Sequence, residues 1–261
     1  MGFKMDLMAA WVGTLAFFCE LVDSSLGMGY GTTLTPVLLL LGFPASLVVP
    51  SVLLSELMSG LTAGAFHHGC GNISLRKGSP DRGVALVLVV TGVAGAVAAV
   101  HVAVNVPMQV LKGYIGAMVL AMGILVLVFR KYRIRFSWPR IVSLGIVSAF
   151  NKGISGGGYG PLVVSGQILS GSDTRSAIGV TSLAEGFICM AAFSLYLAMN
   201  DGRAWLAGNW RFYVPMVAGA LLAAPAAARV TKLASRKVDL RLVVGLLTCG
   251  LGAWTLIRTF G

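Results

Sequence analysis

Charged side chains are scarce in this sequence. They make up 11% of the 261 residues, and 57% of the residues are hydrophobic. A soluble domain carries about 25% charged residues, which it needs to cover its surface. This composition excludes a soluble enzyme, a secreted disulfide scaffold and a disordered protein. What remains is a polytopic membrane protein.

The sequence also lacks the patterns that hold metals, cofactors or catalytic sets. Its four cysteines form no CxxC pair, and they are expected to act as small apolar residues. No Ser/His/Asp set or metal-ligand spacing occurs within the apolar segments. We therefore expect no enzyme activity, no metal site and no cofactor.

The net charge of +11 is carried largely by short loops between apolar segments. In a soluble protein this excess of basic residues would suggest nucleic acid as a partner. Here the pattern indicates loops that set the membrane topology and contact anionic lipid headgroups. The lipid bilayer is therefore the expected partner, with no role for nucleic acid, and a homo-oligomer is left open.

Ten apolar segments follow one another along the chain. The segments of the first half are 6–22, 30–41, 46–66, 83–104 and 107–129, and those of the second half are 141–150, 159–170, 176–199, 211–228 and 240–258. A spanning helix needs about 20 apolar residues. In each half the first two segments are too short to span comfortably, and glycine-rich sequence joins them. We predict one all-α membrane transport domain over residues 1–261.

The two halves of the chain match without a gap when each residue is compared with the residue 129 positions later. Equivalent positions include Gly27 and Gly156, Gly29 and Gly158, and Tyr30 and Tyr159. Glu56 falls on Glu185, although the chain has only three glutamates. The matches indicate an internal duplication, with one repeat at 1–132 and the other at 133–261.

Loop charges indicate how the two repeats are oriented. The basic loops are 67–82, 130–140 and 229–239, and the loops with little or no net positive charge are 104–107 and 196–211. Basic loops face the cytoplasm, so equivalent loops would lie on opposite sides of the membrane. An inverted repeat follows. Three long helices with a short, broken pair in each half would produce it, as would five full crossings, whereas four spans per half would give a parallel repeat.

The glycine clusters are the first candidate for a binding site. They comprise Gly27, Gly29 and Tyr30 in one half, and Gly156, Gly157, Gly158 and Tyr159 in the other. Broken helices expose N-terminal N–H groups that suit an anion, and glycine lets a ligand approach the backbone. The alternative is that the glycines only allow close helix packing. Two clusters at equivalent positions favour a binding site between the repeats.

The same segments resemble a known family. The second half reads Gly-Ile-Ser-Gly-Gly-Gly-Tyr-Gly-Pro-Leu over 153–162 and Ala-Ile-Gly-Val-Thr-Ser over 177–182, with a related version over 26–36. This pattern resembles the TauE/SafE sulfite exporter family over nearly the whole chain. The resemblance implies transport of sulfite, organosulfonates or similar anions across the inner membrane. The first copy departs from it at Met28, where the pattern has glycine.

Lys152 follows Asn151 just before the second glycine cluster, and its repeat equivalent is Asp23. A charge at membrane depth is costly and is usually functional or paired. In one interpretation an ion pair between Lys152 and Asp23 locks the two halves together. In the other, Lys152 attracts the substrate anion, with Asn151 beside it, and Asp23 holds or releases the lysine.

Glu56 and Glu185 lie inside long apolar segments. Burial disfavours a charged carboxylate, so these groups could carry a proton and couple it to anion movement. They could instead only pack neighbouring helices through hydrogen bonds. The favoured function is an alternating-access anion transporter, possibly proton-coupled. The alternative is a cation or proton channel or carrier that uses both glutamates.

Overall fold

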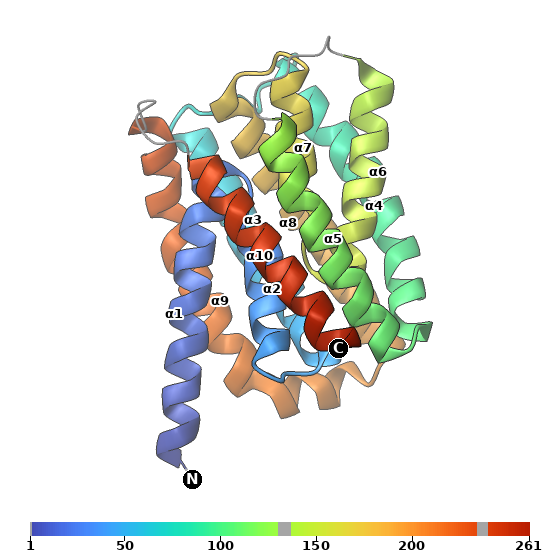
Figure 1. Cartoon of the computed structure of the whole chain (residues 1–261). Helices are drawn as coiled ribbons and strands as arrows, with labels where there is room; N and C mark the ends of the chain where they lie inside the picture. The colour runs from blue at the N-terminus through green and yellow to red at the C-terminus, as the bar shows by residue number, and fades with distance from the viewer. Residues whose placement is uncertain (1, 130–136, 234–239) are drawn as a thin grey trace.

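The computed structural model describes residues 2–129, 137–233 and 240–261, and these residues form helices and connecting loops without strands (Figure 1). The first half contains α1 (Gly2–Leu26), α2 (Tyr30–Leu40), α3 (Ala45–Gly69), α4 (Pro80–Asn105) and α5 (Met108–Phe129). The second contains α6 (Trp138–Ser155), α7 (Tyr159–Leu169), α8 (Thr174–Met199), α9 (Gly202–Leu233) and α10 (Leu240–Phe260). The prediction of an all-α fold is confirmed.

Six stretches within the described helices are long and apolar enough to cross a membrane. They are Met8–Leu26, Ala45–Gly69, Pro80–Asn105, Met108–Leu125, Thr174–Met199 and Gly202–Lys232. By contrast, α2 and α7 have 11 residues each, which reach only about 17 Å at 1.5 Å per residue. The two short helices therefore cannot cross a bilayer by themselves.

Three helices, α1, α6 and α9, are clearly longer than their apolar segments suggested, and α1, whose segment was expected to be too short, includes a stretch long enough to span a membrane. The predicted segment 6–22 includes Glu20 and stops just before Asp23, but α1 continues to Leu26. Similarly, α9 runs from Gly202 to Leu233 through two internal prolines. Hydropathy marks where a segment becomes polar, whereas the helix continues as long as its backbone hydrogen bonds can form.

Equivalent parts of the two repeats have the same local structure. The bounds of α2 and α7 differ by 129 residues at both ends, and α3 and α8 also begin 129 residues apart. Gly27 and Gly156 have φ angles of 72° and 71°, and Gly42 and Gly171 both have φ of 94°. The proposed boundary between residues 132 and 133 lies outside the described residues.

Helices that are equivalent in the two repeats pack against each other in antiparallel directions. In α3 and α8, Gly60 approaches Ser182 while Gly179 packs on the side chain of His67. In α5 and α10, Gly113 approaches Phe260 while Gly252 packs on Leu120. This arrangement is consistent with the predicted inverted repeat.

The antiparallel packing of α3 and α8 also determines where the loops that follow these two helices lie. Because the two helices run in opposite directions, the loop after α3 and the loop after α8 lie at opposite ends of the bundle, as Figure 1 shows. The other two basic loops were predicted at 130–140 and 229–239. Residues 130–136 and 234–239 of these loops lie outside the described residues.

Cysteine labelling can test this topology in a membrane. Cys70 lies in the loop after α3, and Asp201 lies exposed in the loop after α8. In a chain that lacks the other native cysteines, Cys70 and a cysteine introduced as Asp201→Cys should react with an impermeant maleimide from opposite sides of the membrane. Labelling of both from the same side would contradict the inverted repeat.

Candidate functional site

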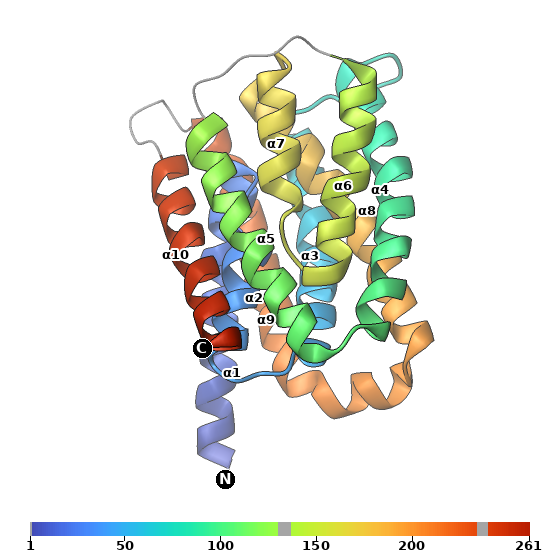
Figure 2. The ribbon, with the colours of Figure 1, turned by 45° about the vertical axis from the view of Figure 1, so that its right-hand side comes forward.

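The two glycine clusters cross at the centre of the bundle. Gly31 lies against the backbone of Gly156 and Gly157, and Gly160 lies against the carbonyl group of Gly27. A Cβ atom at Gly31 would overlap with the Gly156 carbonyl oxygen, so only glycine fits there. In Figure 2, α6 and α7 form a hairpin that enters the bundle from one end. Its loop meets the loop between α1 and α2, which comes from the other end.

The N-terminal ends of α2 and α7 differ in what lies beside them. The backbone N–H of Tyr30, the first residue of α2, donates to the Asp23 carboxylate over 3.0 Å. The residue equivalent to Asp23 near α7 is Lys152. The start of α2 therefore has an internal acid as partner, whereas the equivalent position before α7 in the sequence is a lysine.

Lys152 forms a buried ion-pair network with both repeat-related glutamates. Its Nζ atom contacts Glu56 and lies 2.7 Å from Glu185. The exposed fraction of Lys152 is only 1%. The network joins α6 to α3 and α8, so one lysine of the second repeat binds an acid from each repeat.

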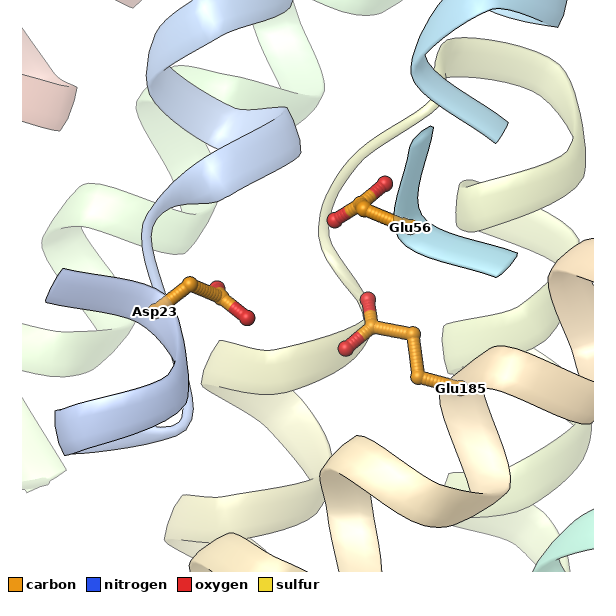
Figure 3. Close-up of side chains that lie close together, drawn as sticks. All are labelled: Asp23, Glu56 and Glu185. Atoms are coloured by element: carbon orange, nitrogen blue, oxygen red, sulfur yellow. The ribbon is translucent and has the colours of Figure 1, made fainter. Parts of the chain in front are cut away.

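Asp23 completes the acidic side of this cluster. The carboxyl groups of Asp23, Glu56 and Glu185 come from α1, α3 and α8 and face a common space (Figure 3), with one oxygen of each within 4.8 Å of the others. The ion pair between Lys152 and Asp23 considered from the sequence is replaced by pairs with Glu56 and Glu185. Asp23 instead binds the start of α2.

The charges around Lys152 do not balance when every carboxyl group is ionised. Four carboxyl groups are at least nine-tenths buried, those of Glu20, Asp23, Glu56 and Glu185. Among the residues whose burial is described, Lys152 is the one lysine or arginine that is buried. An unpaired buried charge costs several kcal/mol or more, and such a group takes up a proton instead. The cluster is thus chemically suited to hold protons.

The two cluster tyrosines have different surroundings. The Tyr30 hydroxyl is hydrogen-bonded to Ser55 over 2.6 Å. The equivalent of Ser55 in the second repeat is Ala184, and the fully buried Tyr159 hydroxyl has no partner. A buried hydroxyl without a partner is costly, so Tyr159 offers a free donor beside the cluster.

Asn151 and Met28 support the site from two sides. Asn151 accepts a hydrogen bond from the Tyr114 hydroxyl of α5, which fixes its side-chain oxygen. Met28 packs with Val164 and Ile178 in a small apolar cluster. This apolar cluster accommodates the methionine side chain where the family pattern has glycine.

The sequence reasoning did not identify every buried polar group near the crossing. Glu20 is 2% exposed, and its Oε2 atom has no hydrogen-bond partner. The hydroxyl groups of Thr32 and Thr35 on α2 are also buried and without partners. The rarity of glutamate could have pointed to Glu20, but the duplication did not, because its equivalent is Ala149.

Two vestibules lie at opposite ends of the bundle. One, of about 370 Å³, is lined by residues at the start of α3, including Pro44 and Leu47. The other, of about 470 Å³, is lined by residues at the start of α8, including Asp173 and Ser176. These residues are repeat equivalents. Neither lining includes the buried carboxyl groups or Lys152.

Comparison with known proteins identifies a family of membrane transporters. The profile of the family described as "Sulfite exporter TauE/SafE" matches residues 12–255. The "Probable membrane transporter protein YtnM" of Bacillus subtilis (strain 168) is 29% identical over 236 residues, which cover 86% of this chain and 74% of that protein. No solved structure matches the chain. Because the family profile matches most of the chain, the chain belongs to the TauE/SafE sulfite exporter family of membrane transporters.

Proposed function

We propose that this protein carries a small sulfur-containing anion, such as sulfite or an organosulfonate, across the inner membrane by alternating access coupled to protons. The observation that supports this most directly is that, among the residues whose burial is described, a single buried lysine lies with four buried carboxyl groups, and vestibules lie at opposite ends of the bundle. The substrate would reach the central cluster from one vestibule at a time. The repeat relation between the vestibules fits two states of similar architecture.

The anion would bind beside Lys152 and the start of α7. A helix N-terminus and an ammonium group both favour an anion. At α2 the same position is closed by Asp23, which already accepts from Tyr30. The free hydroxyl group of Tyr159 would supply a further donor. The glycines at 156–158 would let the ligand approach the backbone closely.

Competition for Lys152 would couple the anion to protons. In the structure the ammonium group binds Glu56 and Glu185. Protonation of these carboxyl groups would release the ammonium group for the anion. Proton binding and anion binding would then favour each other, and by linkage each would raise the affinity for the other by the same factor.

Glutamine variants test this coupling, because an amide resembles the neutral acid but cannot release a proton. Purified Glu56→Gln and Glu185→Gln should still bind sulfite, but lose accumulation driven by a pH gradient in proteoliposomes while keeping anion exchange. We expect Glu185→Gln to show the larger loss, since Glu185 belongs to the same repeat as Lys152.

The exposed Asp201→Asn variant is the matched control for these carboxyl substitutions and should behave as the wild type. Unchanged gradient-driven uptake in both glutamine variants would reject proton coupling at this pair. A panel of sulfur oxyanions in thermal-shift measurements would identify the substrate. Failure of every anion to raise the melting temperature or to enter the vesicles would reject anion transport itself.

A cation carrier is the second candidate, and the acidic trio favours it. Oxygen atoms of Asp23, Glu56 and Glu185 within 4.8 Å of one another could surround a cation. However, the ammonium group of Lys152 already binds two of these acids. Cation-dependent current without any transportable anion would support this alternative.

A further inference from the structure

We propose that Glu20 is an additional proton-binding residue of the transport site, separate from the repeat-related pair Glu56 and Glu185. The proposal rests on the proposed function for its role in transport. The chemical claim is narrower: the Glu20 carboxyl group is neutral in the arrangement described here and exchanges its proton when the cluster rearranges.

The contacts of Glu20 leave its charge without compensation. Ser24 donates to its Oε1 atom over 2.5 Å, and Oε2 has no partner. Lys152, the nearby buried cation, is bound to Glu56 and Glu185. Neutral hydroxyl groups such as those of Ser24 and the nearby Ser59 cannot by themselves stabilise a fully buried carboxylate, whereas a protonated carboxyl group avoids the cost of the buried charge.

The duplication provides an internal comparison. Ala149, the equivalent of Glu20 in the second repeat, is fully buried and packs against α4 of the first repeat. A small apolar side chain therefore satisfies the packing of this position in the same architecture. The repeat architecture therefore does not by itself call for a carboxyl group at this position, which points to a role of Glu20 in the site.

Neighbouring positions show the same asymmetry. Ser24 is equivalent to Gly153, and Ser59, whose buried hydroxyl has no partner, is equivalent to Ile188. Glu20 thus lies among hydroxyl groups on the side of the first repeat only. Hydroxyl groups can both donate and accept, so they can solvate either form of the acid.

Several other titratable groups face this region and must be separated from Glu20 in any test. They are Cys19 and Asp23 of α1, Tyr30 of α2, Glu56 and His67 of α3, Lys152 of α6 and Glu185 of α8. His67 has a structural contact of its own. Its Nε2 atom is hydrogen-bonded to the Ser24 carbonyl group over 3.1 Å.

The repeat supplies a matched variant for His67. Its equivalent, Tyr196, donates to the carbonyl group of Gly153, which is the equivalent of Ser24, over 3.1 Å. His67→Tyr should therefore keep this bond while removing the titratable imidazole. It serves as the control that separates histidine protonation from protonation of Glu20.

Infrared difference spectroscopy of the purified protein between acidic and alkaline pH tests the protonation directly and needs no substrate. Glu20→Gln should remove one protonated-carboxyl band, which His67→Tyr should retain. Glu20→Ala, which copies Ala149, should give the same loss if the glutamine variant fails to fold. An unchanged set of carboxyl bands in a folded Glu20 variant would overturn the proposal.

Proton uptake on sulfite binding then tests the role in transport. In weakly buffered detergent solution, the wild-type Glu20 carboxyl should release its proton when sulfite binding rearranges the cluster, so Glu20→Gln should raise the net number of protons taken up per bound anion by about one. Unchanged uptake would overturn the coupling role of Glu20. Absence of sulfite binding by the wild type would instead reject the proposed function, with the infrared result still standing.

Discussion

Replacement of Lys152 by methionine is expected to abolish anion uptake and to destabilise the protein strongly. The methionine keeps the length of the side chain but removes the ammonium group that binds Glu56 and Glu185. Removal of one partner from a buried ion pair costs about 3–5 kcal/mol. Thermal unfolding in detergent and sulfite uptake in proteoliposomes would measure the two effects.

The destabilisation by Lys152→Met should depend on pH in a defined direction. At low pH the two carboxyl groups can become neutral, so the variant should melt closer to the wild type than at high pH. The double variant Lys152→Met/Glu56→Gln should recover part of the stability but not the uptake. The exposed Lys232→Ala variant is the control. Wild-type affinity and stability in Lys152→Met would show that the lysine is neither a ligand nor a structural ion.

Substitution of Gly31 by alanine should prevent assembly of the central crossing. A methyl group there would overlap with the carbonyl oxygen of Gly156, and the opposing atoms are backbone atoms that cannot rotate away. Overpacking of a core costs about 1–3 kcal/mol, occasionally more, and the rigid contact places this variant at the upper end. We expect loss of the monodisperse fraction in size-exclusion chromatography, together with loss of transport.

Gly160→Ala should have the same effect, because that methyl group would meet the carbonyl oxygen of Gly27. The control is Gly208→Ala in α9, where nothing lies near the added carbon. In a helix the alanine should even be favourable by up to about 1 kcal/mol. Normal yield and uptake of Gly31→Ala would mean that the two loops separate more easily than their contact suggests.

The internal duplication allowed much of this architecture to be predicted from the sequence. It paired Glu56 with Glu185 and aligned both glycine clusters, and the structure brings these residues to the centre of the bundle. Helix lengths were less predictable, since α1 continues through Glu20 and Asp23. Apolar runs end at such residues because hydropathy does not reveal that the acids face the protein interior.

The ion-pair partners of Lys152 could not be predicted from the duplication. Equivalence suggested Asp23 as partner of Lys152, but antiparallel packing of α3 and α8 brings Glu56 and Glu185 to the lysine. Glu20 was not predicted as a site residue, because the equivalent position in the second repeat is not acidic. A duplication identifies what the halves share, whereas the differences between them become meaningful only when the contacts are known.

The charge difference between Asp23 and Lys152 has a consequence for the ancestry of the protein. Two identical subunits must carry the same residue at both equivalent positions. A dimer of the first half alone would gather only acids, whereas a dimer of the second half would contain Lys152 and Glu185 twice. A lysine on one side and an aspartate on the other therefore require two copies that can mutate independently, as the two halves of this duplicated chain can.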